Sequence, residues 1–188
     1  MPRLARSAME TKQFVTCVGL ITSNGPYGHN VMACEWTHQI SYDPFLIAVC
    51  IRSHKATFLN IKQTKVFGVN LAASDQNWIA SIAGNNNGKT VDKIKVLEEL
   101  GVAFYPAGSI DVLMIKGAAM TAECRLVKLV DIGDHPLLIG EVATVSDYPK
   151  EPIIYHRGKY FQVGEQMKKP DSQTLAHFDD VIKKYKKD

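Results

Sequence analysis

The sequence has 188 residues, of which 46% are apolar and 22% are charged, and its formal net charge is +3. A chain of this length and composition is expected to form one packed core, which excludes a disordered protein. The small net charge argues against a nucleic-acid partner and stays compatible with a small anionic ligand. No apolar run approaches the ~20 residues of a membrane helix, so we expect no membrane contact and a cytoplasmic location.

The four cysteines are widely spaced and form no Cys-x-x-Cys pair, which argues against a zinc ribbon or a redox dithiol. Most of them lie in apolar, β-branched runs, where cysteine commonly behaves as a small buried side chain. Cys34 and His38 are four residues apart, but the sequence around them indicates strand and loop rather than helix. We therefore expect no metal site.

The first part of the chain is predicted to contain three strands before any helix. Residues 14–22 are dense in apolar and β-branched side chains and end in a cluster of turn residues, Ser23-Asn24-Gly25-Pro26-Tyr27-Gly28. Residues 31–36 can pair back on this strand as a hairpin. Residues 45–51, introduced by Asp43-Pro44, form a third apolar run that is too short for a typical helix.

Short helices and further strands follow. We expect helices over 57–64, from an N-cap at Ser74 to residue 82, and over 96–100, with a strand at 66–71. Strands are expected over 110–115, 118–131 and 137–145, and a final hairpin over 153–155 and 160–163. The last segment has an amphipathic helical pattern with Leu175, Phe178, Val181 and Ile182 on one side.

Many short strands with turns between them favour a closed or nearly closed barrel over a doubly wound parallel sheet. The chain also lacks the Gly-x-Gly-x-x-Gly sequence of a Rossmann dinucleotide site. The predicted fold is therefore mainly β with short helices. We expect a single domain over residues 1–188, with its core at 14–163 and a C-terminal helix at 173–187.

The loop Gly84-Asn85-Asn86-Asn87-Gly88-Lys89-Thr90 is similar to a P-loop but has three residues, not four, before its Gly-Lys pair. It also follows a predicted helix where a P-loop follows a strand, so nucleotide hydrolysis is not expected. Its glycines would let backbone N–H groups approach an anion, and Lys89 adds a mobile positive charge. Composition alone favours a solvated surface loop.

A second polar segment, Arg52-Ser53-His54-Lys55-Ala56-Thr57, lies where a strand ends and a helix begins. Free backbone N–H groups at a helix start, together with hydroxyl and basic side chains, suit a phosphate. A plain N-cap explains the same residues equally well. His135 lies in a loop between two strands, where it could contact a ligand or simply form the turn.

Taken together, these segments resemble the flavin reductase-like family, whose fold is the FMN-binding split β-barrel of Greek-key type. The matching pieces occur in the family's order and span roughly residues 14–163. The resemblance extends to the flavoredoxin and ferric-reductase-like branch. The pieces are Gly28-His29-Asn30-Val31-Met32-Ala33 with Trp36, Arg52-Ser53-His54-Lys55-Ala56-Thr57, Phe67-Gly68-Val69-Asn70, Gly88-Lys89-Thr90-Val91-Asp92-Lys93, Gly133-Asp134-His135 with Ile139-Gly140-Glu141-Val142, and Tyr155-His156-Arg157-Gly158-Lys159-Tyr160.

The resemblance implies a role for each matching position. The isoalloxazine edge would lie beside Asn30, Val31, Met32 and Ala33. The phosphate would be held by Arg52, Ser53, His54 and Thr57, with Lys89 of the polar loop supplying the counter-charge and Gly88 of the same loop also binding the cofactor. Asn70, Leu71 and Ala72 would lie close to the flavin or its ribityl chain, and His135 near the ring face where a nicotinamide could stack.

The resemblance also implies bound FMN, NAD(P)H as electron donor and a homodimer in which the C-terminal helix could contribute contacts. The leading interpretation is an NAD(P)H:flavin oxidoreductase that passes electrons to free flavin, ferric iron or a protein acceptor. The cofactor carries that chemistry, which explains why no catalytic triad is visible. The alternative is a flavoredoxin-type carrier without NAD(P)H activity. A pyridoxamine-phosphate-oxidase-like enzyme and a basic nucleic-acid-binding module fit less well, and the sequence does not select between NADH and NADPH.

Overall fold

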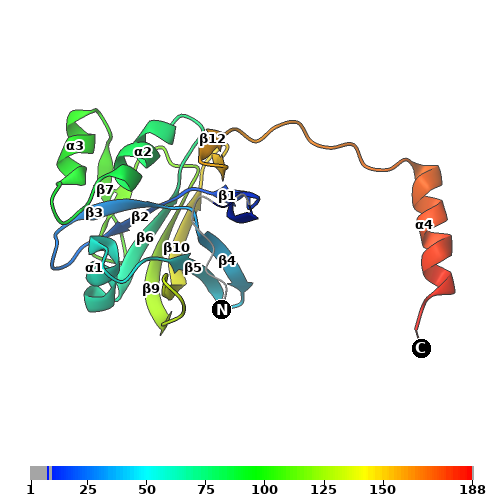
Figure 1. Cartoon of the computed structure of the whole chain (residues 1–188), viewed down its shortest axis with the longest axis horizontal. Coiled ribbons are helices and arrows are strands. Elements are labelled where there is room, and N and C mark those ends of the chain that lie inside the picture. Colours follow the sequence, from blue (N-terminus) through cyan, green and yellow to red (C-terminus); the bar gives the residue numbers. More distant parts are fainter. Residues whose placement is uncertain (1–7, 9, 188) are drawn as a thin grey trace.

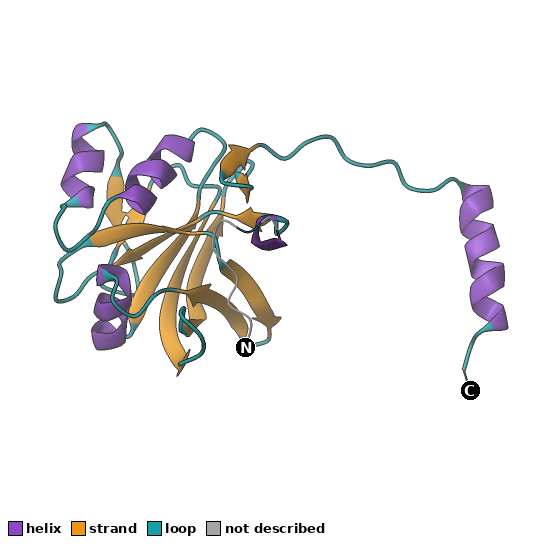
Figure 2. Ribbon diagram, in the orientation of Figure 1, coloured by secondary structure: helices purple, strands orange, loops and turns teal. Residues whose placement is uncertain are grey.

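The computed structural model describes residue 8 and residues 10–187, and it shows a β-rich body with one helix standing apart from it (Figures 1 and 2). The body contains a seven-stranded antiparallel sheet, a three-stranded sheet and a two-stranded sheet. Its strands are β1 Thr16–Cys17, β2 Gly19–Ser23, β3 Asn30–Cys34, β4 Thr37–Tyr42, β5 Phe45–Cys50, β6 Val66–Leu71, β7 Phe104–Pro106, β8 Leu113–Ile115, β9 Met120–Val130, β10 Leu137–Asp147, β11 Ile154–His156 and β12 Lys159–Phe161.

The main sheet has the strand order β3-β2-β6-β9-β10-β5-β4, so β3 and β4 are its two edges. These edges are also neighbours in sequence, separated only by Glu35 and Trp36. The sheet must therefore curl until its edges meet at this link. There the Thr37 hydroxyl donates to the Cys34 carbonyl at 3.0 Å, and Gly19 of β2 lies directly against the Thr37 side chain, where a Cβ atom would collide.

Side chains alternate between two apolar clusters along the strands. Ile21, Phe67 and Leu138 belong to the cluster enclosed by the curled sheet, whereas Leu20 and Val31 belong to a second cluster. All five side chains are fully buried. The sheet thus separates a barrel interior from an outer layer, as expected when strands bury both faces.

Four α-helices and one 3-10 helix accompany the strands, and α1, α2 and α3 all contact the edge strand β3. This edge is consequently covered by helices, while the opposite edge, β4, pairs only with β5. The helices are η1 Glu10–Lys12, α1 Ala56–Thr64, α2 Asn77–Asn85, α3 Lys93–Glu99 and α4 Ser172–Lys184.

The structure confirms the mainly β fold, the hairpin of β2 and β3, and the C-terminal helix. Some element predictions were wrong. β4 and β7 were missed, and the first predicted strand is two strands, β1 and β2, so five strands rather than three precede α1. The strand expected over 14–22 is interrupted at Val18, and α2 begins after Gln76, so Ser74 is not its N-cap.

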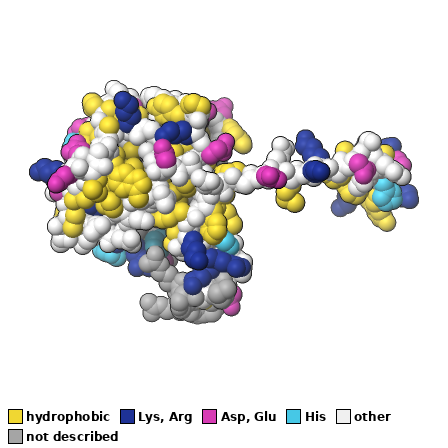
Figure 3. Space-filling view, turned by 90° about the horizontal axis from the view of Figure 1, so that it is seen from above, with side chains coloured by type: hydrophobic (Ala, Val, Ile, Leu, Met, Phe, Trp, Pro, Cys, Tyr) yellow, Lys and Arg dark blue, Asp and Glu magenta, His cyan; other side chains and the backbone are white. Residues whose placement is uncertain are grey.

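The C-terminal helix α4 follows the extended segment 162–171 and buries none of its residues. Figures 1 and 2 show it well away from the body, and Figure 3 shows hydrophobic side chains exposed on it. Leu175, Phe178 and Val181 are 45%, 46% and 37% exposed. Within the described part of the chain, no helix is both long and apolar enough to cross a membrane.

Gly140 gives a direct test of the interior packing. A Cβ atom there would collide with the Phe67 ring and lie 2.8 Å from the Cβ of Cys124, both of them fully buried. We expect Gly140→Ala to lower the free energy of unfolding by about 1–3 kcal/mol, as overpacking usually does. Urea denaturation measures this value. Gly164→Ala is the control, because its Cβ atom meets open space, and equal stability of both variants would contradict the packing.

Candidate functional site

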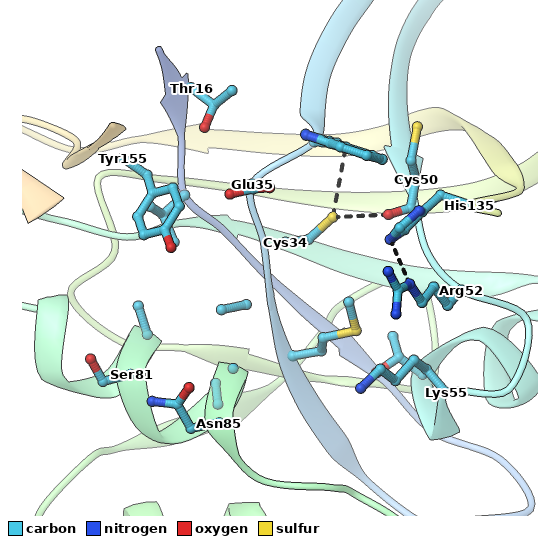
Figure 4. Close-up of a pocket in the computed structure, with 18 of the residues that line it drawn as sticks. Thr16, Cys34, Glu35, Cys50, Arg52, Lys55, Ser81, Asn85, His135 and Tyr155 are labelled. Carbon is cyan, nitrogen blue, oxygen red and sulfur yellow. Dashed lines mark hydrogen bonds between the residues drawn. The ribbon is translucent and has the colours of Figure 1, made fainter. Parts of the chain in front are cut away.

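A groove of about 880 Å³ lies beside β3, a volume suited to a small-molecule ligand. Figure 4 shows its walls: Cys34 ends β3 and Glu35 follows it, Lys55 lies at the start of α1, Ser81 and Asn85 project from α2, and Tyr155 comes from β11. Because β3 is an edge strand, one side of its backbone is not used by the sheet. The groove therefore brings together a free strand edge, two helices and a hairpin.

At one end of the groove, a buried hydrogen bond joins β3 to α1. The Asn30 amide nitrogen donates to the Thr57 hydroxyl at 2.7 Å, and both side chains are at most 3% exposed. Gly88 packs so closely against the Asn30 amide that any Cβ atom would collide with it. Segments around residues 30, 57 and 88 thus meet at one polar junction that lines the groove.

Of the three described lysines that line the groove, Lys55 is the N-cap residue of α1 and Lys93 is the first residue of α3. Lys93 is 2% exposed, and its ammonium donates to the carbonyl of Ala83 at 3.0 Å. Burial, and then the positive charge of Lys55, lowers the pKa of Lys93 to about 8. Neither lysine forms an ion pair with any described residue. A buried ammonium beside a second cation is costly, and an anionic ligand would offset that cost.

Arg52, Asp134 and His135 form a hydrogen-bonded cluster next to Lys55 (Figure 4). Arg52 Nε donates to His135 Nε2 at 3.1 Å, and His135 Nδ1 lies 2.8 Å from Asp134 Oδ1. The hydrogen bond from His135 lowers the pKa of the exposed Asp134 carboxyl, and the charges of His135 and Arg52 act in the same direction. The ring of Trp36 meets His135 edge to face, with centroids 4.6 Å apart. Backbone bonds from Cys50 to Trp36 and from Ile51 to Pro136 hold these segments together.

Two cysteines also line the groove. The Cys34 thiol donates to the carbonyls of Cys50 and Trp36, and burial raises its pKa to about 11. Burial also raises the pKa of Cys50. A thiol that ionises so reluctantly is a poor nucleophile. Among the described residues, no group of three potential ligands could hold a metal ion.

The sequence comparison identifies the family. A family model described as a flavin reductase like domain matches residues 11–164. The chain belongs to this family.

Individual relatives agree with this assignment. An uncharacterised protein of Pyrococcus abyssi is 31% identical over 113 residues, which cover 60% of this chain and 63% of that protein. The match thus spans just under two thirds of that relative. The reductase subunit HsaB of a flavin-dependent monooxygenase from Mycobacterium tuberculosis is 25% identical over 98% of this chain and 91% of its own length. The flavoredoxin of Desulfovibrio vulgaris (Miyazaki F) shares the fold, with a TM-score of 0.75 at 22% identity, over 93% of this chain and all of that one.

Only some of the site residues predicted from the family resemblance line the groove. The predicted site residues that line it are Asn30, Met32, Ala33, Arg52, Thr57, Gly88 and His135. Those that do not line it are Val31, Ser53, His54, Asn70, Leu71, Ala72 and Lys89. Ser53 and His54 are exposed beside lining residues, so their phosphate contacts stay predictions.

The side chains of Asn70 and Val31 have structural partners outside the groove, while their predicted proximity to the flavin stays a prediction. Asn70 is fully buried, and its amide donates to the Leu20 carbonyl while its oxygen accepts from the Ile115 backbone N–H at 2.8 Å. Those bonds tie β2 to β8, so its side chain serves the fold. Val31 points into the outer apolar cluster, as alternation along β3 requires. A flavin contact by either side chain therefore has no support from the lining of the groove.

Lys93 is the residue that sequence reasoning missed as a functional candidate. It stands on the buried face of α3 with Ile94 and Leu97, a position where an apolar side chain is expected. The predicted helix begins at residue 96, three residues after the start of α3, and therefore leaves Lys93 outside the helix. A lysine four residues before a buried leucine was the available signal.

The cluster at Arg52 predicts the tautomer of His135. Because Arg52 Nε can only donate, His135 Nε2 must accept, and the ring proton therefore lies on Nδ1 and points to Asp134. Nitrogen-15 NMR of the neutral ring should show protonated Nδ1 and bare Nε2. The Arg52→Met variant removes the donor and serves as the comparison. An Nε2–H tautomer in the unaltered protein would contradict the cluster.

Proposed function

We propose that the groove binds FMN, and the observation that carries this proposal is the pair Lys55 and Lys93 beside the junction of Asn30 and Thr57. The pair offers two positive charges, and the junction offers a hydroxyl and an amide, which is the donor set that a phosphate requires. The contact of Gly88 with Asn30 also brings the loop backbone close to the same place. The residues present therefore fit a flavin phosphate.

The remaining contacts follow from the lining. Met32 and Ala33, on the free edge of β3, are proposed to lie along the isoalloxazine, with backbone groups available for its polar edge. Trp36 and His135 also line the groove and are proposed to border the place where a nicotinamide could stack. Lys55 and Lys93 are proposed to take the counter-charge role that the family resemblance implied for Lys89.

We propose that the protein is an NAD(P)H:flavin oxidoreductase with free flavin, ferric iron or a protein as onward acceptor. Bound flavin would accept a hydride from NAD(P)H and release electrons to the acceptor. The chain's own part is to orient both rings and to stabilise the charge that develops, for which no protein nucleophile is needed. The HsaB relative, named as a reductase subunit, supports this proposal.

The visible spectrum and one anaerobic reaction test this function. The purified protein should take up FMN and show a flavin spectrum, which NADH or NADPH should bleach within seconds in a stopped-flow instrument. A protein that stays colourless with added FMN would contradict the flavin site. Uptake of FMN without bleaching by either nucleotide would instead identify a flavoredoxin-type carrier.

The lowered pKa of Lys93 makes FMN affinity depend on pH. A bound phosphate favours the charged ammonium, so the pKa of Lys93 should lie above 8 in the complex. Below pH 8 the free protein already carries this proton, and affinity is complete. As the pH rises above 8, binding must take up a proton and affinity falls. Riboflavin, which lacks the phosphate, should show no such fall, as titrations of flavin fluorescence can establish.

Replacement of Lys93 completes this test. Lys93→Met should weaken FMN binding on the order of 10-fold to 100-fold, the range of a hydrogen bond to a charged group, and should remove the pH dependence. Riboflavin affinity should be unchanged. Lys62→Met, on the exposed side of α1, is the matched control. If Lys93→Met binds both ligands normally, the phosphate lies elsewhere.

We further propose that residues 1–188 form one flavin reductase-like domain that works as a cytoplasmic homodimer, with α4 packed on the partner. The support for this proposal is that α4 has an apolar face of the kind that is usually buried. In the single chain this face is exposed. The extended segment 162–171 gives the helix the reach to cross to a second copy. Sedimentation of a chain ending at Val163 should show loss of the dimer, and an unchanged dimer would contradict the role of α4.

A further inference from the structure

The link between β3 and β4 places an acidic side chain, Glu35, in a groove that is also lined by lysines and arginines. The other carboxylate of the lining, Asp134, is already bonded to Arg52 and His135. Glu35 is half-buried and forms no ion pair with any described residue. Its carboxylate oxygens can therefore accept hydrogen bonds from a ligand in the groove.

A hydroxyl without a partner lies on the same side of the groove. Among the described residues, Thr16 Oγ1 is the one buried side-chain polar atom that has no hydrogen-bond partner. Thr16 lines the groove, and Figure 4 shows it together with Glu35 and Tyr155 on the side away from Lys55. A buried hydroxyl that stays unpaired is unfavourable, so a ligand atom that accepts from it would offset this cost.

Strand pairing and a thiol hold Thr16 close to the link that carries Glu35. Thr16 in β1 pairs with Tyr155 in β11. The next residue, Cys17, donates its thiol to the carbonyl of Thr37 at 3.2 Å, and Thr37 comes directly after the link. β1 is thereby attached to the first residue of β4. One hydroxyl donor and one carboxylate acceptor consequently line the groove from adjacent segments.

We propose that Glu35 and Thr16 bind the carboxamide of the nicotinamide ring of the electron donor. The Glu35 carboxylate accepts from the amide nitrogen, and the Thr16 hydroxyl donates to the amide oxygen. A primary amide offers one donor group and one acceptor oxygen, which is the complement of this pair. The inference rests on the proposed function, in which the nicotinamide stacks beside Trp36, the residue that follows Glu35.

Glu35 also has an electrostatic role in the same reaction. When the donor passes a hydride to the flavin, its neutral dihydronicotinamide ring loses two electrons together with one hydrogen and becomes a cationic pyridinium. A carboxylate next to the ring stabilises this positive charge as it develops. Since Glu35 lies away from Lys55 in the groove, it acts on the nicotinamide and leaves the flavin phosphate to the lysines.

Titrations of the oxidised, FMN-loaded full chain test the carboxamide contact. The probes are NAD+ and nicotinic acid adenine dinucleotide, which has a carboxylate in place of the carboxamide, and binding is followed by the flavin absorbance. The unaltered protein should bind NAD+ about tenfold more tightly, because two carboxylates repel each other. Glu35→Gln should raise the Kd for NAD+ about tenfold and abolish the preference, since a glutamine amide can donate to a carboxylate. If NADPH is the donor that bleaches the flavin, the 2′-phosphorylated forms of both probes take their place.

Two further variants complete the experiment. Thr16→Val keeps the shape of the side chain without its hydroxyl, and it should weaken NAD+ binding several-fold. Glu99→Gln, on an exposed position of α3 outside the groove, is the matched control and should change nothing. None of the three variants should change the Kd for FMN. In stopped-flow experiments at saturating donor, Glu35→Gln should also bleach the flavin about tenfold more slowly than the unaltered protein.

The outcomes separate this inference from the proposed function. If Glu35→Gln keeps the preference for NAD+ and binds it normally, while FMN binds and is bleached as before, the carboxamide contact is refuted and the reductase stands. If the unaltered protein binds FMN but neither binds a nucleotide nor is bleached by one, the reductase proposal and this inference both fail.

Discussion

The two-residue link between β3 and β4 is the constraint on which the rest of the structure depends. It joins opposite edges of a seven-stranded sheet, so the sheet cannot stay open at that end. β3 pairs only with β2, so the other side of its backbone has no partner strand. An unpaired strand edge is usually covered by other elements or occupied by a ligand. Helices cover part of it, and the groove occupies the remainder. The curl of the sheet and the groove beside β3 therefore have the same structural cause.

The same closure explains the electrostatics of the site. Contacts with β3 draw α1, α2 and α3 together, which places Lys55 and Lys93 on facing elements around one end of the groove. No described carboxylate balances them, although Asp92 and Lys95 are paired one turn away. A fold that buries an ammonium without a counter-ion loses stability, and this cost is the physical basis of the proposal that an anion binds here.

The sequence predicted those strands whose side chains are mostly apolar and buried. β2, β5 and β6 are apolar runs and were found, whereas β4 is mostly exposed and polar, and so carries no such pattern. The site was harder, because its residues meet through tertiary packing. Nothing local shows that Asn30 bonds Thr57, 27 positions away. The family resemblance brought these segments together, but it could not reveal which lysine is buried.

Lys89 and Lys93 illustrate that limit. They are four residues apart in one basic, glycine-containing segment, and composition treats them alike. Asp92 separates them physically, since its side chain caps α3 by accepting from the Lys95 N–H at 3.2 Å and thereby fixes where the helix begins. Lys93 then falls on the buried face of α3, toward the groove, while Lys89 stays in the loop on the far side of Gly88. The position of one helix cap thus determines which of the two lysines lines the groove.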